Sequence, residues 1–223
     1  MAHGRNPKSL KSSATNPGTS RDVEERLRRA REAWLKESVE TPRFRQRLQT
    51  LTEPHRGSLG VAAPACPEEP RWRAIHEAGH TVAQFLLKGT IPEKVTISRM
   101  GGAVQDFGNF ALAAILCGDA PISLDQVAPD IDVYLAGIAA ESLVATNPQW
   151  ELAQSDLNAA NMFIEYVEDA APDCLEGLLE PTVQLLVDNW DLVVNVASAL
   201  VSKPTLRAEQ VQSCIGMVRH QNP

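Results

Sequence analysis

The spacing of apolar and polar residues divides the 223-residue chain into segments of different character. Residues 1–20 are rich in Ser, Asn, Gly and Thr, and we expect them to form a disordered basic tail. In residues 21–38 apolar side chains recur at steps of four, three and four among Arg and Glu, which is typical of an amphipathic helix. We expect this helix to be either a docking or oligomerising helix or a surface helix on its own domain, within a charged helical appendage over 21–51. The Pro- and Gly-rich residues 52–69 indicate a linker.

From residue 71 the pattern changes to that of a folded body. Residues 71–87 are apolar nearly all round from Ala74 onward, which predicts a buried helix that begins after Pro70. Residues 94–98 (KVTIS) are rich in β-branched side chains and alternate, which predicts a strand. A turn follows, and 103–110 are expected to return as a second strand.

Two further apolar helices are predicted at roughly 132–145 and at 151–168, followed by closing helices. The fold class expected is therefore mainly α (α+β), with a small sheet of two or three strands beside helix 71–87. We assign the folded domain to residues 70–216 and a C-terminal tail to 217–223.

Charge and composition narrow the classes of partner. Residues 1–60 carry 13 Lys and Arg against 7 Asp and Glu, whereas 61–223 carry 8 against 21. An acidic body argues against nucleic-acid binding, because phosphate contacts need Lys and Arg on one face. No run of 18 apolar residues occurs, so we expect no membrane insertion. The four cysteines form no CxxC pair and are expected to be reduced thiols in a cytoplasmic protein, with organelle targeting by the basic, Ser-rich tail left open.

Helix 71–87 contains the motif His76-Glu77-Ala78-Gly79-His80, which is HExxH. Histidines four residues apart lie one above the other on a helix, so their imidazoles can ligate one Zn²⁺. Glu77 is then placed to take a proton from water at the metal, as a general base. Polar side chains on a buried helix also need partners, and a metal site supplies them. The motif therefore predicts a zinc centre with His76 and His80 as ligands and Glu77 as the catalytic residue.

A third protein ligand has to come from elsewhere in the chain. The other histidines, His3, His55 and His220, lie near the ends or in the expected linker, so a carboxylate is favoured. Asp156 falls on the apolar stripe of helix 151–168, where a lone carboxylate is costly unless it is paired or bound to metal. Glu141 in the preceding helix is the competing candidate, and the pattern favours Asp156.

Several segments together resemble the zinc-peptidase domain of the FtsH-type metallopeptidase family. AIHEAGHTVAQFLL is similar to its zinc-binding helix, and PEKVTISRMGGAVQDFGNF to its following strand pair. LAGIAAESLV, AQSDLNAANMFIEYV and VQLLVDNWDLVVNVASALVSKPTLRAEQV resemble its later helices. The resemblance covers roughly residues 70–216. It implies a helical zinc-metallopeptidase fold, with His76, His80 and Asp156 as zinc ligands and Glu77 as general base.

The sequence also departs from that family. FtsH-type proteins carry membrane segments and an AAA+ ATPase module, whereas these 223 residues contain no GxxxxGK motif of a P-loop. The family's basic residue in LGGRAAE is Ile138 here. We therefore expect an ATP-independent zinc metalloendopeptidase that cuts unfolded or flexible segments. Its partners would be an unfolded polypeptide and either a separate unfoldase or further copies of itself.

Substrate binding is expected at the strand pair. An edge strand beside the zinc helix can pair with an extended peptide through backbone hydrogen bonds, which favours Gly101, Gly102, Ala103 and Val104 as contacts. The alternative function is a non-catalytic, zinc-stabilised domain that binds peptides or regulates without cutting them. A third hypothesis is an autoregulated protease whose basic arm lies across its acidic cleft.

Overall fold

The computed structural model describes residues 41–60, 70–97, 103–104, 122–167, 170–171 and 173–219. The predictions for residues 1–40, for most of the returning strand and for Gly101 and Gly102 lie outside these residues. The described elements, in chain order, are α2 (Pro42–Thr52), η1 (Glu53–His55), α3 (Pro70–Lys88), β1 (Lys94–Thr96), β2 (Ala103–Val104), α5 (Leu124–Val144), α6 (Trp150–Ile164), α7 (Cys174–Asp188), α8 (Trp190–Ser202), β3 (Thr205–Arg207) and α9 (Ala208–Arg219).

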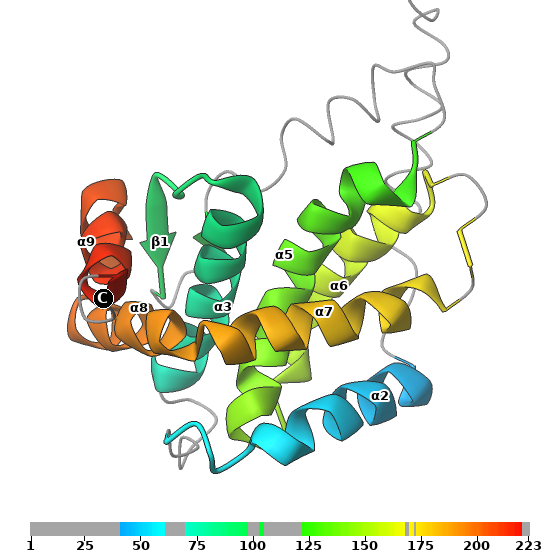
Figure 1. Ribbon diagram of the computed structural model, residues 1–223, viewed down its shortest axis with the longest axis horizontal. Helices are drawn as coiled ribbons and strands as arrows, with labels where there is room; N and C mark the ends of the chain where they lie inside the picture. Colours follow the sequence, from blue (N-terminus) through cyan, green and yellow to red (C-terminus); the bar gives the residue numbers. More distant parts are fainter. Residues whose placement is uncertain are drawn as a thin grey trace, which may run out of the picture.

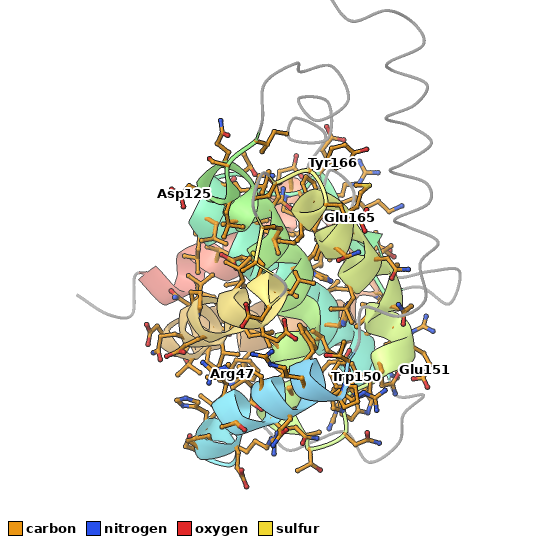
Figure 2. All side chains as sticks on the ribbon, turned by 90° about the vertical axis from the view of Figure 1, so that its right-hand side faces the viewer. Arg47, Asp125, Trp150, Glu151, Glu165 and Tyr166 are labelled. Carbon is orange, nitrogen blue, oxygen red and sulfur yellow. The ribbon has the colours of Figure 1, made fainter. Side chains whose placement is uncertain are left out.

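The mainly α prediction is confirmed, since helices form most of the described chain and the only sheet found there is small. Figure 1 shows α3, α5 and α6 side by side, with α7 and α8 crossing them and α2 below. Helices α5 and α6 run in opposite directions. Asp125 at the start of α5 therefore lies at the same end as Glu165 and Tyr166, just past the end of α6, while Trp150 lies at the other end near α2 (Figure 2).

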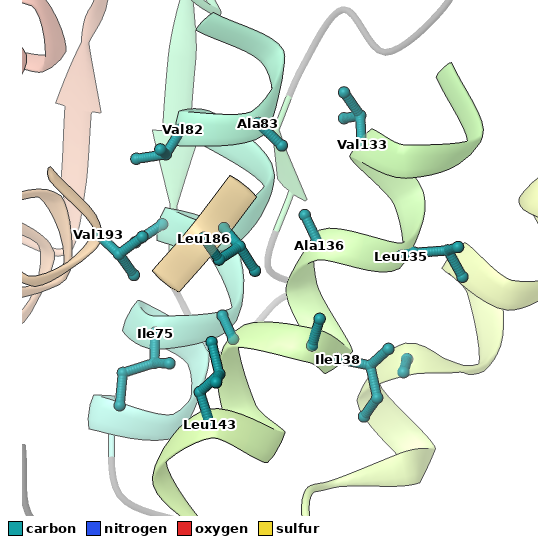
Figure 3. Packing of buried hydrophobic residues seen from close by; sticks show 14 of the residues in the cluster. Ile75, Val82, Ala83, Val133, Leu135, Ala136, Ile138, Leu143, Leu186 and Val193 are labelled. Carbon is teal, nitrogen blue, oxygen red and sulfur yellow. The ribbon is translucent and has the colours of Figure 1, made fainter. Parts of the chain in front are cut away.

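Helix α3 is the centre of the hydrophobic core, as its all-round apolar pattern predicts. Ile75 and Val82 face Val193 of α8, whereas Ala136 of α5 points toward α3 from the opposite side (Figure 3). Leu135 and Ile138 point away from α3 toward α6. The helix ends at Lys88 because Gly89 adopts a left-handed conformation with φ of 66°.

Small residues allow α3 and α5 to approach each other closely. A Cβ atom built on Gly79 would lie 2.5 Å from the carbonyl oxygen of Ala136 and 2.8 Å from the Cβ of Ala140. Only glycine fits at this point of α3, and alanine is the largest residue tolerated opposite it. The small-residue stretch of α5 therefore sets the separation of the two helices and brings the HExxH face against α5.

Helix α5 begins at Leu124, eight residues before the predicted start near 132. Its first turn is fixed by the side chain of Gln126, whose Oε1 accepts the backbone N–H of Ser123 at 2.9 Å. The apolar pattern did not predict this first turn, because Pro129 and the acidic residues around it are typical of the N-terminus of a helix. Proline inside a helix removes one hydrogen bond, but it does not end α5 here.

The sheet lies beside α3 and has the order β2-β1-β3, with both pairs antiparallel. Val95 pairs with Val104 on one side and with Leu206 on the other. Strand β3 was missed by the sequence analysis because three residues between two helices give too short a period-2 signal. Among the described strands β2 lies at an edge, which is the position expected for the peptide-binding strand.

Helix α2 lies within the range predicted as an appendage, yet it packs on the body. Phe44 and Leu48 are buried in the common core, and Arg43 and Arg47 form ion pairs with Asp173 and Glu180 of α7. The guanidinium of Arg45 lies 4.8 Å from the ring centroid of Trp150 at the start of α6. This helix is therefore held to α7 by two ion pairs and contacts the start of α6.

Two properties bear on the environment of the chain. Within the described ranges no single helix is long and apolar enough to cross a membrane. Helices α7 and α8 together have sufficient length and apolar composition, but they are bent by 76° relative to each other. Cys174 and Cys214 are free and buried, while Cys66 and Cys117 lie outside the described residues.

The partly buried carboxyl of Asp132 in α5 should make the stability of the protein depend on pH. Burial raises the pKa of Asp132 to about 6, although the Thr182 hydroxyl 2.9 Å away partly offsets this effect. Because the folded state holds the proton more tightly than the unfolded state, this residue's contribution to stability falls as the pH rises from about 4 to about 6.

Asp132→Asn should therefore stabilise the protein by about 1–3 kcal/mol at pH 7.5 and have little effect at pH 4, since one pKa unit corresponds to about 1.4 kcal/mol. Urea unfolding of both proteins at the two pH values measures this difference. An equal difference at both pH values would contradict the assignment.

Candidate metal centre

Three side chains from two helices converge on one point. Nε2 of His76 lies 2.9 Å from Nε2 of His80, and Oδ2 of Asp156 lies 3.0 Å from the former and 3.3 Å from the latter. The histidines come from α3 and Asp156 from α6. The structure thus brings together the three residues that the sequence favoured as ligands.

The helix period explains this convergence. His76 and His80 lie one turn apart on the face of α3 that packs on α5, and their rings meet edge to face with centroids 4.6 Å apart. Asp156 lies two turns along α6, on the same face as the buried Ala153 and Ala160. Its side chain is 17% exposed, whereas both imidazoles are buried, so the group is open to solvent on the Asp156 side.

Hydrogen bonds on the far side of each ring determine which nitrogen carries the proton. Nδ1 of His76 lies 2.8 Å from a carboxylate oxygen of Glu141, and Nδ1 of His80 lies 2.7 Å from the carbonyl oxygen of Val133. A carboxylate and a carbonyl only accept hydrogen bonds, so each neutral ring carries its proton on Nδ1. The Nε2 lone pairs of both rings therefore face Asp156.

This arrangement fits a bound cation. Three acceptor atoms about 3 Å apart repel one another unless a positive charge lies between them. A tetrahedral zinc site with ligand distances of about 2.0–2.1 Å separates its ligand atoms by about 3.3 Å, close to the separations found here. Two imidazole nitrogens and one carboxylate are also a donor set that suits Zn²⁺. The chemistry of the site therefore matches the ion that the sequence predicts.

The pKa shifts of His76 and Asp156 also indicate that this site favours a positive charge. Burial opposes the charged form of His76, but hydrogen bonds to Asp156 and Glu141 outweigh it and raise its pKa well above the usual value. Burial likewise opposes the charge on Asp156, yet the two histidines hold its pKa well below the usual range. In the absence of a metal, a proton on His76 can supply the positive charge that the site requires.

Glu77 lies next to the ligand group and is 6% exposed. Burial raises the pKa of its carboxyl, an effect that the neighbouring His76 and His80 partly oppose. Among the described residues its carboxylate forms no hydrogen bond to another side chain, so it is available to a water molecule or a substrate. A raised pKa brings a carboxylate closer to the value useful for a general base near neutral pH.

Two contributors were not identified from the sequence as parts of the site. Glu141 was considered only as a rival ligand, and the structure places it on the opposite side of the His76 ring from Asp156. Gly137 is the second, since a Cβ atom there would lie 2.5 Å from Nε2 of His80 and 2.7 Å from Nε2 of His76. An isolated glycine inside an apolar, Ala-rich helix is the sequence signal that indicates such a close approach.

The predicted peptide-binding residues are only partly described. Ala103 and Val104 form β2, which packs near α3, while Gly101 and Gly102 lie outside the described residues. The structure thus places part of an edge strand beside the helix that carries the histidines.

In comparisons with known proteins, no family model matches the chain and no curated protein matches it. The resemblance to FtsH-type peptidases therefore remains an expectation from the quoted motifs.

The space above Gly137 gives a direct test of the metal centre. Gly137→Ala should weaken zinc binding at least tenfold, because its methyl group would displace two imidazoles that Glu141 and Val133 hold in place. Gly177→Ala in α7 is the matched control, since nothing lies within 4 Å of a Cβ at that position. Chelator competition measures the Kd, and wild-type affinity in Gly137→Ala would contradict this view of the site.

Proposed function

We propose that this protein is a zinc metalloendopeptidase that hydrolyses peptide bonds in unfolded or flexible polypeptide segments without ATP. The observation that carries the proposal is the convergence of two Nε2 lone pairs and one carboxylate oxygen beside a buried glutamate. His76, His80 and Asp156 would hold the ion. Zinc bound there supplies a Lewis acid that makes water more acidic and polarises a carbonyl oxygen.

Glu77 performs the proton transfers. Its carboxylate takes a proton from the attacking water, whose oxygen forms a bond to the carbonyl carbon of the substrate. The carbon–nitrogen bond then breaks, and Glu77 gives the proton to the leaving amine nitrogen. The raised pKa of Glu77 supports both steps, because a carboxyl whose pKa lies closer to neutral pH can both accept a proton from water and return it to the amine.

The small sheet offers a way to position the substrate. An extended peptide can add to the edge at β2 through backbone hydrogen bonds, which do not depend on side-chain identity. Such binding requires an unpaired strand, so flexible segments are the expected substrates. The 223 residues contain no P-loop motif, which is why cleavage by this chain is proposed to need no ATP.

Glu77→Gln tests the function while preserving the shape of the site. We expect the variant to bind zinc as the wild type does and to cut unfolded casein, without ATP, at least 100-fold more slowly, because general bases contribute about 10²–10⁴ to rates. Glu151→Gln, which changes an exposed acid in the first turn of α6, is the matched control and should retain full activity.

The outcomes separate the two functions left open by the sequence. Cleavage by the wild type alone supports the peptidase, and removal of zinc with a chelator should then abolish it. Equal cleavage by Glu77→Gln would contradict the role of Glu77. Zinc binding by both proteins with cleavage by neither would replace the peptidase with a zinc-stabilised binding domain.

A further inference from the structure

Glu141 is the most deeply buried carboxylate beside the metal centre, with no solvent exposure. Both of its oxygens have partners. Oε1 lies 2.8 Å from Nδ1 of His76, and Oε2 accepts the backbone N–H of Gln149 at 2.6 Å. We propose that Glu141 is a positioning residue that fixes two zinc ligands at once, His76 directly and Asp156 through the start of α6. This inference rests on the proposed zinc centre.

The hydrogen bond between Glu141 and His76 controls which nitrogen of the imidazole carries the proton. Because the Glu141 carboxylate can only accept, it requires a proton on Nδ1 and so leaves the Nε2 lone pair directed at the ligand group. A hydrogen bond to the other ring nitrogen also fixes the orientation of a ligating imidazole and makes it a better donor. Without this partner the ring can rotate or place its proton on Nε2, which cannot then bind a metal.

The hydrogen bond between Glu141 and the backbone of Gln149 fixes the start of α6. Gln149 is the residue before the first helical residue, Trp150, and its own side chain does not cap the helix. The Glu141 carboxylate satisfies its N–H from a neighbouring helix and places a negative charge at the positive end of α6. Asp156 lies seven residues further along the same helix face, so the position of the helix start determines where the Asp156 carboxylate lies.

The number of acceptor atoms makes this proposal testable. A carboxylate offers two acceptor oxygens, and Glu141 uses one for each partner. A glutamine of the same shape offers only one acceptor oxygen, and its NH₂ group is a donor. Glu141→Gln must therefore either lose the bond to Gln149 or turn its NH₂ group toward Nδ1 of His76, which moves the imidazole proton to Nε2.

The experiment compares wild type, Glu141→Gln and Asp132→Asn. Asp132 is the matched control because it is another largely buried acid of α5 that is hydrogen-bonded to α7 rather than to the metal centre. Chelator competition gives the zinc Kd, and hydrogen exchange of the Gln149 amide in the metal-free proteins reports the helix start independently. The His76 ring nitrogen shifts in the same metal-free samples, recorded at a pH high enough for the ring to be neutral, identify the tautomer.

We expect Glu141→Gln to bind zinc about 10–100-fold more weakly, the range typical for partners of metal-ligating histidines. It should also show either faster exchange at Gln149 or a proton moved to Nε2 of His76, and Asp132→Asn should show none of these changes. Wild-type zinc affinity in Glu141→Gln would overturn the inference while leaving the proposed function intact. Absence of zinc binding in the wild type would overturn both.

Glu141→Gln could also fail to fold, because its position is fully buried. Circular dichroism detects this, and Gln149→Pro then carries the test, since residue 141 stays a glutamate while the Gln149 N–H is replaced by a ring carbon that displaces Oε2. The φ of −86° at Gln149 is close to the range that proline adopts. Weaker zinc binding by a folded Gln149→Pro supports the inference, and unchanged binding overturns the coupling to α6.

Discussion

The close contact between α3 and α5 is the constraint on which the rest of the structure depends. Gly79 lets the backbone of α5 approach α3, and Gly137 leaves space for the two imidazoles between the helices. With larger side chains at either position the helices would separate, and His80 would lose its bond to the Val133 carbonyl. The same contact forms the core and shapes the site, so the core and the candidate metal centre share one set of small residues.

The three groups that converge on the site all present acceptor atoms when both imidazoles are neutral. Outer hydrogen bonds fix both imidazole protons on Nδ1, and Asp156 adds a negative charge to the two lone pairs. A buried group of this kind is costly unless a cation or a proton neutralises it. Buried clusters of ionisable groups with strongly shifted pKa values are typical of functional sites.

Much of this organisation could be predicted from the sequence because its signals are local. HExxH on an apolar helix identified His76, Glu77 and His80, and the carboxylate on an apolar stripe favoured Asp156. The role of Glu141 could not be predicted, because it depends on a bond between α3 and α5 and on a loop that follows α5. The early start of α5 and strand β3 were missed because Pro129 resembles a boundary and three residues show no clear period.

In the proposed metal centre, two imidazoles and one carboxylate hold a zinc ion. X-ray absorption at the zinc edge on the purified, zinc-loaded protein tests it most directly, because the spectrum distinguishes sulfur from lighter ligands and recognises imidazole rings. We expect two imidazole ligands at about 2.0–2.1 Å in a four-coordinate site completed by oxygen, and in Asp156→Ala the same two imidazoles with weaker zinc binding. A sulfur ligand, or a spectrum without imidazole rings, would contradict the proposed metal centre.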